Sequence, residues 1–376
     1  MNSGLLFCDL AVAGVRGLSP YQPGKPIEEL ERELGITGIV KLASNENPLG
    51  ASPRALEAAA AAMSETHRYP DGSGFLLKQA LSAHHQVAPE QITLGNGSND
   101  LLDVLARVFL EPGREAVVSQ YAFAIYALST QAVGAQCVTV PALGPDSDMP
   151  YGHDLEAMAD AITERTAIVF VANPNNPTGT WLTQAQLERF LDRVPRRVVV
   201  VLDEAYTEYA RDLACPDGTQ WLARYPNLVV TRTFSKAYGL AGLRVGYSLS
   251  SPEIADLLNR VRHPFNVNSL ALAAAEAALD DCAHIEQSVA LNAREMKRLC
   301  AAFDAAGLKW LPSAGNFISV EIGNAAAAYQ ALLRRGVIVR PMAGYGLPSY
   351  LRVSVGLAEE NSRFLIALDE YLEEAR

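Results

Sequence analysis

Short apolar runs rich in β-branched residues alternate with longer helical patterns between residues 92 and 248. Such runs lie at 92–94, 116–118, 137–140, 167–172, 198–202, 228–231 and 245–249. Strands separated by helices indicate an α/β unit with a largely parallel sheet, because parallel neighbours need a crossover connection. Ligands of such sheets bind beyond the carboxyl ends of the strands, so polar motifs with a function are expected there.

Polar residues do follow several of these runs at the point where each run ends. Asn173 comes after the run 167–172, Asp203 comes after 198–202, and Ser235 and Lys236 follow 228–231 closely. Because parallel strands end at the same edge of a sheet, we expect these side chains to lie near one another.

Composition favours a soluble globular protein of more than one domain. The chain has 376 residues, of which 49% are hydrophobic and 19% charged, and its net charge is −11. No run of basic residues is present, which argues against a nucleic-acid partner. No apolar stretch is long enough to span a membrane, and because the apolar run at residues 5–7 is short and follows no basic residues, we expect no signal peptide. The five cysteines form no CxxC pair, so we expect a cytoplasmic protein without a metal site or disulfide framework.

The pattern changes after about residue 265. A long helix is predicted over 270–302, followed by short strands at 316–321 and 351–355 and a closing helix from Glu359. We therefore predict a large cofactor-binding α/β domain over 45–265. A smaller α+β domain would combine residues 1–44 with 266–376.

Lys236 lies among small residues after a predicted strand, and Arg244 follows eight positions later. A lysine and an arginine placed in this way could hold an aldehyde cofactor covalently and its phosphate ionically, which fits pyridoxal phosphate. Asp203 would be costly to bury alone, and a protonated pyridine nitrogen would be a suitable partner. Tyr206 could reach the neighbouring ring hydroxyl. The simpler alternatives are a solvated lysine and an aspartate that pairs with an arginine or caps a helix.

Two further motifs favour a bound ligand. Residues 95–100, GNGSND, precede an amphipathic pattern and predict free backbone N–H groups at a helix N-terminus, which suits a phosphate. An ordinary capped helix is the alternative, and a dinucleotide site is disfavoured because the third glycine of its fingerprint is missing. In residues 172–179, ANPNNPTG, the prolines would hold Asn176 rigidly at the sheet edge.

Together these motifs resemble the fold-type I pyridoxal-phosphate-dependent aminotransferases, most closely the histidinol-phosphate aminotransferase family. The resemblance spans nearly the whole chain and rests on LASNENPLG, YPDG, GNGSND, ANPNNPTG, DEAY, SKAYGLAGLRVGY and LRVSVG, in that order. It implies a large domain with a mostly parallel sheet flanked by helices, a smaller α+β domain, and pyridoxal 5'-phosphate as cofactor. It also implies a homodimer with shared active sites.

The resemblance implies roles residue by residue. Lys236 would anchor the cofactor and transfer protons, Asp203 would face the ring nitrogen, and Tyr206 and Asn176 would donate to the ring oxygen. The phosphate would be held by Gly97, Ser98, Asn99, Ser235 and Arg244, with Tyr69 reaching it from the neighbouring subunit. The family often has an acidic pair where this chain has Ser98 and Asn99, a change that keeps hydrogen-bond donors. The ring-stacking aromatic departs from the usual motif, and Phe123 is favoured over Tyr121.

For the substrate, the resemblance implies that Arg352 binds a carboxylate and Arg340 a phosphate, with Tyr21 and Asn47 as further pocket residues. The implied reaction converts histidinol phosphate and 2-oxoglutarate to imidazole acetol phosphate and glutamate in histidine biosynthesis. An aromatic amino-acid aminotransferase is the first alternative, and a threonine-phosphate decarboxylase is the second. A non-catalytic regulator would need an attached basic helix-turn-helix, for which the chain before the first motif leaves little room.

Overall fold

The computed structural model describes residues 7–21, 24–211, 213 and 215–375. Residues 1–6, 22–23 and 376 of the predicted small domain, and residues 212 and 214 of the large one, lie outside the described residues. The main sheet has seven strands in the order β2-β8-β7-β6-β5-β3-β4, and β8 is antiparallel to both of its neighbours. The predicted, mostly parallel sheet is therefore confirmed. Its strands agree with the predicted runs to within two residues at each end: β2 Ile92–Gly95, β3 Glu115–Ser119, β4 Gln136–Val140, β5 Thr166–Ala172, β6 Val199–Asp203, β7 Leu228–Thr233 and β8 Gly246–Leu249.

Helices cover both faces of this sheet, and the central strands show why. Successive residues of a strand point to opposite faces, and in β6 Val200 and Leu202 join one buried cluster while Val199 and Val201 join another. A strand that is buried on both sides reads as a continuous apolar run, which is what the sequence shows. The helices of this part of the chain are α4 Pro53–Ala62, α5 Phe75–His85, α6 Ser98–Phe109, α7 Ala124–Ala132, α8 Leu155–Asp160, α9 Gln184–Arg193, α10 Pro252–Val261 and α11 Ser269–Leu279.

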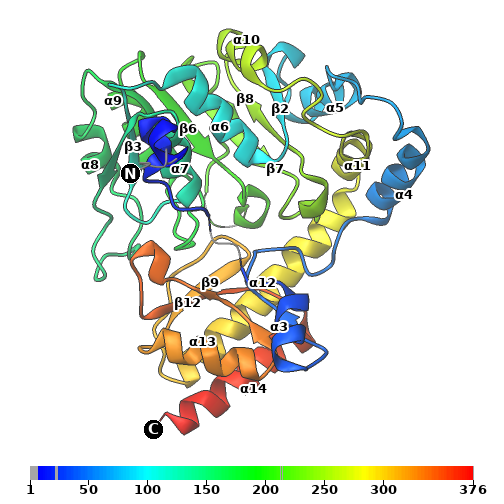
Figure 1. Ribbon diagram of the computed structural model, residues 1–376, viewed down its shortest axis with the longest axis vertical. Helices are drawn as coiled ribbons and strands as arrows, with labels where there is room; N and C mark the ends of the chain where they lie inside the picture. The colour runs from blue at the N-terminus through cyan, green and yellow to red at the C-terminus, as the bar shows by residue number, and fades with distance from the viewer. Residues whose placement is uncertain (1–6, 22–23, 212, 214, 376) are drawn as a thin grey trace, which may run out of the picture.

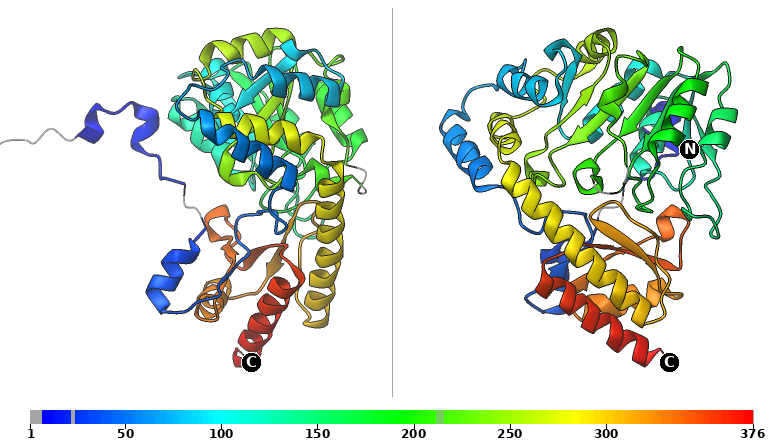
Figure 2. Two further views of the ribbon diagram at one scale, coloured as in Figure 1. Left: turned by 90° about the vertical axis from the view of Figure 1, so that its right-hand side faces the viewer. Right: turned by 180° about the vertical axis from the view of Figure 1, so that it is seen from behind.

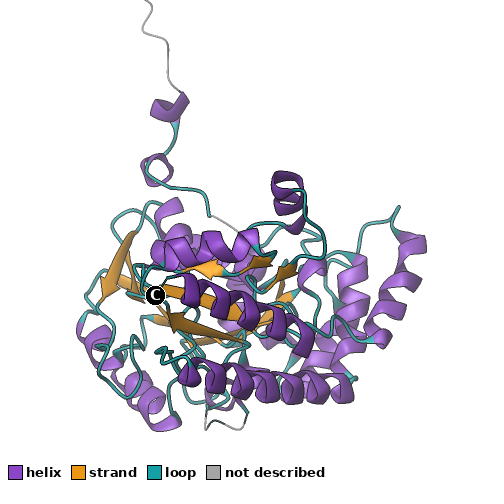
Figure 3. Ribbon diagram, turned by 90° about the horizontal axis from the view of Figure 1, so that it is seen from below, coloured by secondary structure: helices purple, strands orange, loops and turns teal. Residues whose placement is uncertain are grey.

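A second group of elements packs around a smaller sheet, which Figure 1 shows below the main one. Its three antiparallel strands lie in the order β11-β12-β9, and a separate parallel pair joins β1 to β10. Seen from below, helices lie on either side of the strands (Figure 3). The pairing of β1 brings the N-terminal segment to this group, while the boundaries at residues 45 and 265 stay predictions. The elements are α3 Ile27–Leu34, β1 Val40–Lys41, α12 Cys282–Ala305, β9 Phe317–Glu321, α13 Ala325–Arg334, β10 Val337–Ile338, β11 Arg340–Pro341, β12 Tyr350–Ser354 and α14 Ala358–Glu374, after two single-turn helices, α1 Phe7–Leu10 and α2 Ala13–Arg16.

The single long helix predicted over 270–302 is wrong. The structure has two helices, α11 and α12, separated at Asp280 and Asp281. The side chain of Asp281 accepts a hydrogen bond from the backbone N–H of His284 and so caps α12. The apolar periodicity continues through this break, so the pattern alone predicts one helix. The capping aspartate is the only local sign that a second helix begins here. Figure 2 shows α12 crossing from the level of the main sheet to that of the smaller one.

In the described part of the chain, no helix combines the length and the apolar character that a membrane span requires. The same residues contain no cluster of three or more histidine, cysteine, aspartate or glutamate side chains that could hold a metal ion.

Candidate active site

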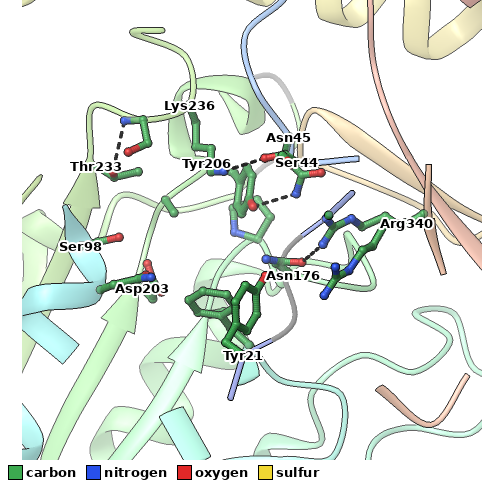
Figure 4. Close-up of a pocket in the computed structure, with 18 of the residues that line it drawn as sticks. Tyr21, Ser44, Asn45, Ser98, Asn176, Asp203, Tyr206, Thr233, Lys236 and Arg340 are labelled. Carbon is green, nitrogen blue, oxygen red and sulfur yellow. Dashed lines mark hydrogen bonds between the residues drawn. The ribbon is translucent and has the colours of Figure 1, made fainter. Parts of the chain in front are cut away.

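A cavity lies where β5, β6 and β7 end, and most of the predicted site residues line it (Figure 4). The strand ends supply Ala172, Asp203 and Thr233, and the turns after the strands supply the longer side chains. The cavity therefore occupies the sheet edge at which the sequence places its polar motifs. The predicted residues in its lining are Tyr21, Ser98, Asn99, Phe123, Asn176, Asp203, Tyr206, Ser235, Lys236, Arg244, Arg340 and Arg352.

Lys236 is partly buried in this cavity and is not a solvated surface lysine. Its Nζ donates a hydrogen bond to the backbone oxygen of Ser44 at 3.2 Å and lies 5.7 Å from the ring centre of Tyr206. Burial lowers the pKa of Lys236 to about 8, and the nearby positive charges of Arg352 and Arg244 act in the same direction. About a tenth of its amine is therefore neutral at pH 7, far more than for an ordinary lysine, and the neutral form is what a nucleophile or proton acceptor needs.

Asp203 is the last residue of β6 and is 6% exposed. Its Oδ2 accepts a hydrogen bond from Tyr126 Oη at 2.7 Å, whereas its buried Oδ1 has no partner among the described residues. Burial raises the pKa of this carboxyl group. The nearby Arg232 pairs instead with Glu204 and Asp217, at 2.6 Å each. Asp203 is thus a buried acid with one oxygen left for a donor in the cavity.

Tyr206 and Asn176 present polar groups beside Lys236. The Tyr206 hydroxyl accepts a hydrogen bond from Asn45 Nδ2 at 3.0 Å, and burial raises the pKa of Tyr206 to about 12. The phenol is therefore protonated near neutral pH and keeps its own hydrogen for donation. Asn176 Oδ1 accepts from Arg352 Nη1 at 2.6 Å, which fixes the amide and leaves its nitrogen as a donor.

The turn before α6 has the features of an anion site. Gly97 precedes the helix with φ +79°, and the first N–H groups of the helix, from Ser98 onward, have no partners within it. Arg244 reaches the same place and donates from Nη1 to Ser235 Oγ at 3.3 Å. A Cβ atom at Gly97 would come within 2.3 Å of Arg244 Nη2, so the close approach of backbone and guanidinium needs glycine. Helix N-terminus and arginine together favour a phosphate group.

The structure separates the two aromatic candidates for ring stacking. Phe123 lies directly before α7 and lines the cavity. Tyr121 is outside the lining and packs in a different apolar cluster with Leu311, Met342 and Tyr350. This arrangement favours Phe123, as the spacing of the motif does.

Two arginines close the other side of the cavity. Arg340 of β11 and Arg352 of β12 are paired residues of adjacent antiparallel strands, so their side chains leave the same face of the sheet. Arg352 is 5% exposed, donates to Asn176 and to the oxygen of Ala43, and forms no ion pair with any described carboxylate. The guanidinium of Arg340 lies 5.7 Å from the ring centre of Tyr21. This concentration of positive charge favours anionic substrates.

Three predicted residues are not part of the cavity lining, namely Gly97, Asn47 and Tyr69. Asn47 is buried and donates to the oxygen of Ala237 at 2.8 Å and to Ser288 Oγ at 2.9 Å, which links neighbouring segments. Tyr69 is 83% exposed, and its ring stacks on Phe265 with the centroids 4.7 Å apart. Within the described chain neither side chain reaches the cavity.

The structure also adds residues that the sequence reasoning did not select. Asn45 and Tyr126 contact Tyr206 and Asp203, and the Ser44 oxygen accepts from Lys236. Asn45 lies in the same SNENP run as the predicted Asn47, and it is Asn45 that lines this cavity. Tyr126 lies about one helical turn after Phe123, and this spacing is the only feature of the sequence that indicates its place near the site.

Comparisons with known proteins match this chain to one enzyme family. The family model for aminotransferase class I and II matches residues 37–368. Histidinol-phosphate aminotransferase 2 of Pseudomonas aeruginosa is 62% identical over 369 residues, which cover 97% of this chain and 98% of that protein. Histidinol-phosphate aminotransferase 1 of Nitrosococcus oceani is 57% identical over 372 residues and covers 99% of both chains.

Solved structures show the same fold. The histidinol-phosphate aminotransferase from Sinorhizobium meliloti, in complex with pyridoxal-5'-phosphate, has a TM-score of 0.85 at 31% identity, covering 97% of this chain and 98% of its own. A Thermus thermophilus aspartate aminotransferase mutant has a TM-score of 0.83 at 24% identity, covering 96% and 98%, which is a likeness of fold alone. The predicted fold-type I class is confirmed, and the chain belongs to the class I and II aminotransferase family.

Proposed function

We propose that the protein transfers the amino group of histidinol phosphate to 2-oxoglutarate, giving imidazole acetol phosphate and glutamate. The observation that carries this proposal is the pair Arg340 and Arg352, which leave the same sheet face into the cavity that holds Lys236. One substrate carries a phosphate and the other two carboxylates, so a single site must bind anions of both kinds. The histidinol-phosphate aminotransferase of Pseudomonas aeruginosa, at 62% identity, supports the same choice.

The cavity residues fit pyridoxal 5'-phosphate as the cofactor. The unpartnered Oδ1 of Asp203 suits a protonated ring nitrogen, and the turn at Gly97 with Arg244 suits the phosphate. Lys236, whose pKa is lowered to about 8, suits attachment to the aldehyde. When bound, the cofactor supplies an electron sink for the electron pair that remains after the substrate α-carbon loses its proton.

The protein's own groups then orient the substrate and move protons. The neutral amine of Lys236 accepts the proton from the α-carbon of the amino donor in the first half of the reaction. In the second half, its protonated form gives a proton to the α-carbon that becomes that of glutamate, and such a role is worth roughly 10²–10⁴ in rate. Tyr206 and Asn176 donate hydrogen bonds from fixed positions, because Asn45 and Arg352 hold them. Arg352 receives the anionic group of the substrate, since it has no carboxylate partner among the described residues.

The substrate assignment is tested by comparing kcat/KM for histidinol phosphate and for phenylalanine, each with 2-oxoglutarate as acceptor. We expect a clear preference for histidinol phosphate, because phenylalanine has no second anion for Arg340. A preference for phenylalanine would replace the proposal with an aromatic amino-acid aminotransferase. Release of carbon dioxide from threonine phosphate would identify a decarboxylase instead.

The proposal includes a homodimer with shared active sites. Tyr69 is exposed and its ring stacks on the exposed Phe265, and such an exposed apolar pair suits burial against a second copy. Mixing a Tyr69→Ala variant with a Lys236→Ala variant tests this, since one site of each mixed dimer would regain both residues. Recovered activity supports shared sites, and verified mixed dimers without activity would refute them.

The cysteines are all unpaired, which supports a reducing compartment such as the cytoplasm.

A further inference from the structure

Asn45 occupies the centre of a hydrogen-bond network that reaches Tyr206. It is 1% exposed and adopts a left-handed backbone conformation, φ +54°, which asparagine tolerates better than most residues do. Its backbone N–H donates to Ser354 Oγ at 2.8 Å, and its backbone oxygen accepts from Asn316 Nδ2 at 3.1 Å. Its side-chain Oδ1 lies 3.0 Å from Ser354 Oγ, and its Nδ2 lies 3.0 Å from Tyr206 Oη.

The hydroxyl of Ser354 decides which way the Asn45 amide faces. Ser354 Oγ already accepts the Asn45 N–H, so its own hydrogen is available to Asn45 Oδ1. If the amide were flipped, the Ser354 hydrogen would lose this acceptor in a buried position, where an unmade hydrogen bond costs about 1–3 kcal/mol. The stable arrangement therefore turns Oδ1 towards Ser354 and the amide nitrogen towards Tyr206.

This orientation determines what the Tyr206 hydroxyl does. The Asn45 amide can only donate from Nδ2, so Tyr206 Oη accepts there and its hydrogen is directed elsewhere. Tyr206 lines the cavity beside Lys236 and Asp203, as Figure 4 shows, and the open side of its hydroxyl is the cavity. A carboxylate in place of the amide would reverse the direction of the hydrogen bond between residue 45 and Tyr206, because a carboxylate accepts hydrogen bonds and donates none.

We propose that Asn45, oriented by Ser354, is a positioning residue that keeps the Tyr206 hydroxyl as a hydrogen-bond donor to the ring oxygen of the cofactor. This inference rests on the proposed pyridoxal-phosphate chemistry. The three residues come from distant segments: Asn45 follows β1, Tyr206 follows β6, and Ser354 ends β12. The polarity of one hydrogen bond in the site thus depends on contact between the N-terminal and C-terminal parts of the chain and the main sheet.

The test is Asn45→Asp in the holoenzyme, with the pH midpoint of the bound cofactor's visible absorption as readout. Aspartate has nearly the same shape, tolerates the same backbone conformation, and would accept the hydrogen of Tyr206. The cofactor oxygen then loses a donor that favours its anionic form. We expect the midpoint to rise by roughly one to two pH units, since a hydrogen bond to a charged group is worth about 1.5–3 kcal/mol.

The new negative charge would itself raise the midpoint, so the change is repeated in a Tyr206→Phe background. The other charged or titratable groups around Tyr206 are the same in both backgrounds, namely Asp203, Lys236, Arg352, Tyr126, Tyr209 and Tyr345. We expect the shift caused by Asn45→Asp to be smaller in the Tyr206→Phe background by about one unit. Equal shifts in the two backgrounds would overturn the inference.

Ser354→Ala provides an independent variant that adds no charge. Without the serine hydroxyl the Asn45 amide loses its orienting partner, so the midpoint should rise by a smaller amount. Asn45 would have no positioning role if Ser354→Ala left the midpoint unchanged and Asn45→Asp shifted it equally in the wild-type and Tyr206→Phe backgrounds. If the wild-type protein binds pyridoxal phosphate without a visible, pH-dependent band, the proposed cofactor chemistry is at fault and not the role of Asn45.

Discussion

Replacing Asp203 by asparagine should raise the free energy of unfolding of the apoenzyme and lower its affinity for the cofactor. The carboxylate is buried at the end of β6, receives one hydrogen bond from Tyr126, and forms no ion pair within the described part of the chain. A buried charge without a cation is unfavourable, and asparagine keeps the shape without the charge. We expect the apoenzyme to gain about 1–3 kcal/mol in free energy of unfolding. For a chain of this length that corresponds to roughly 1 to 4 °C in Tm.

The gain should depend on pH in a defined direction. Burial raises the pKa of Asp203, so the folded apoenzyme binds this proton more tightly than the unfolded chain does. The wild-type apoenzyme therefore loses stability relative to the variant as pH rises from the unfolded value of about 3.9 through the raised folded value. The advantage of Asp203→Asn should therefore grow as the pH rises through the raised folded-state pKa and should disappear towards acid pH.

Thermal unfolding of the two apoenzymes at pH 8 and at pH 5 measures this difference. Tyr126→Phe is the matched control, because it removes the hydrogen bond from Tyr126 Oη to Asp203 Oδ2 and should lower the stability of the apoenzyme. With pyridoxal phosphate bound the order should reverse, since Asp203→Asn loses the charged partner of the ring nitrogen and should weaken cofactor affinity about 10- to 150-fold. An Asp203→Asn apoenzyme that is less stable than wild type at pH 8 would refute the reasoning.

Three other predictions follow from the same geometry. Lys236→Ala should abolish multiple turnovers and the visible band of the attached cofactor, and measurable repeated turnover by this variant would contradict the role of the lysine. Arg340→Ala should lower kcat/KM for histidinol phosphate far more than for phenylalanine, whereas equal losses would show that Arg340 is not the phosphate ligand. Arg232→Met should lower the free energy of unfolding in urea by about 3–5 kcal/mol, because it leaves the buried Glu204 without its partner. The exposed Arg224→Met is its control, with a loss of less than about 1 kcal/mol, and similar losses in the two variants would contradict the estimate.

The strands of the main sheet could be predicted because each one is a short apolar run with its own boundaries. Burial on both faces requires such a run, so β5 and β6 are visible without any tertiary information. The same local logic predicted the polar residues at the strand ends. It failed at the junction of α11 and α12, where a single aspartate cap interrupts an otherwise continuous helical pattern.

The sequence by itself determined the fold class and the chemical groups of the cavity, because strand periodicity and the motifs around Lys236, Asp203 and Asn176 are local properties. Only the tertiary structure decided that Asn45 and not Asn47 reaches the pocket, since these asparagines are two positions apart in one motif. Contacts across the chain with Tyr206 and Ser354 hold Asn45 at the pocket. The pairing of Arg340 with Arg352 on adjacent strands is likewise a matter of register, which no local pattern specifies.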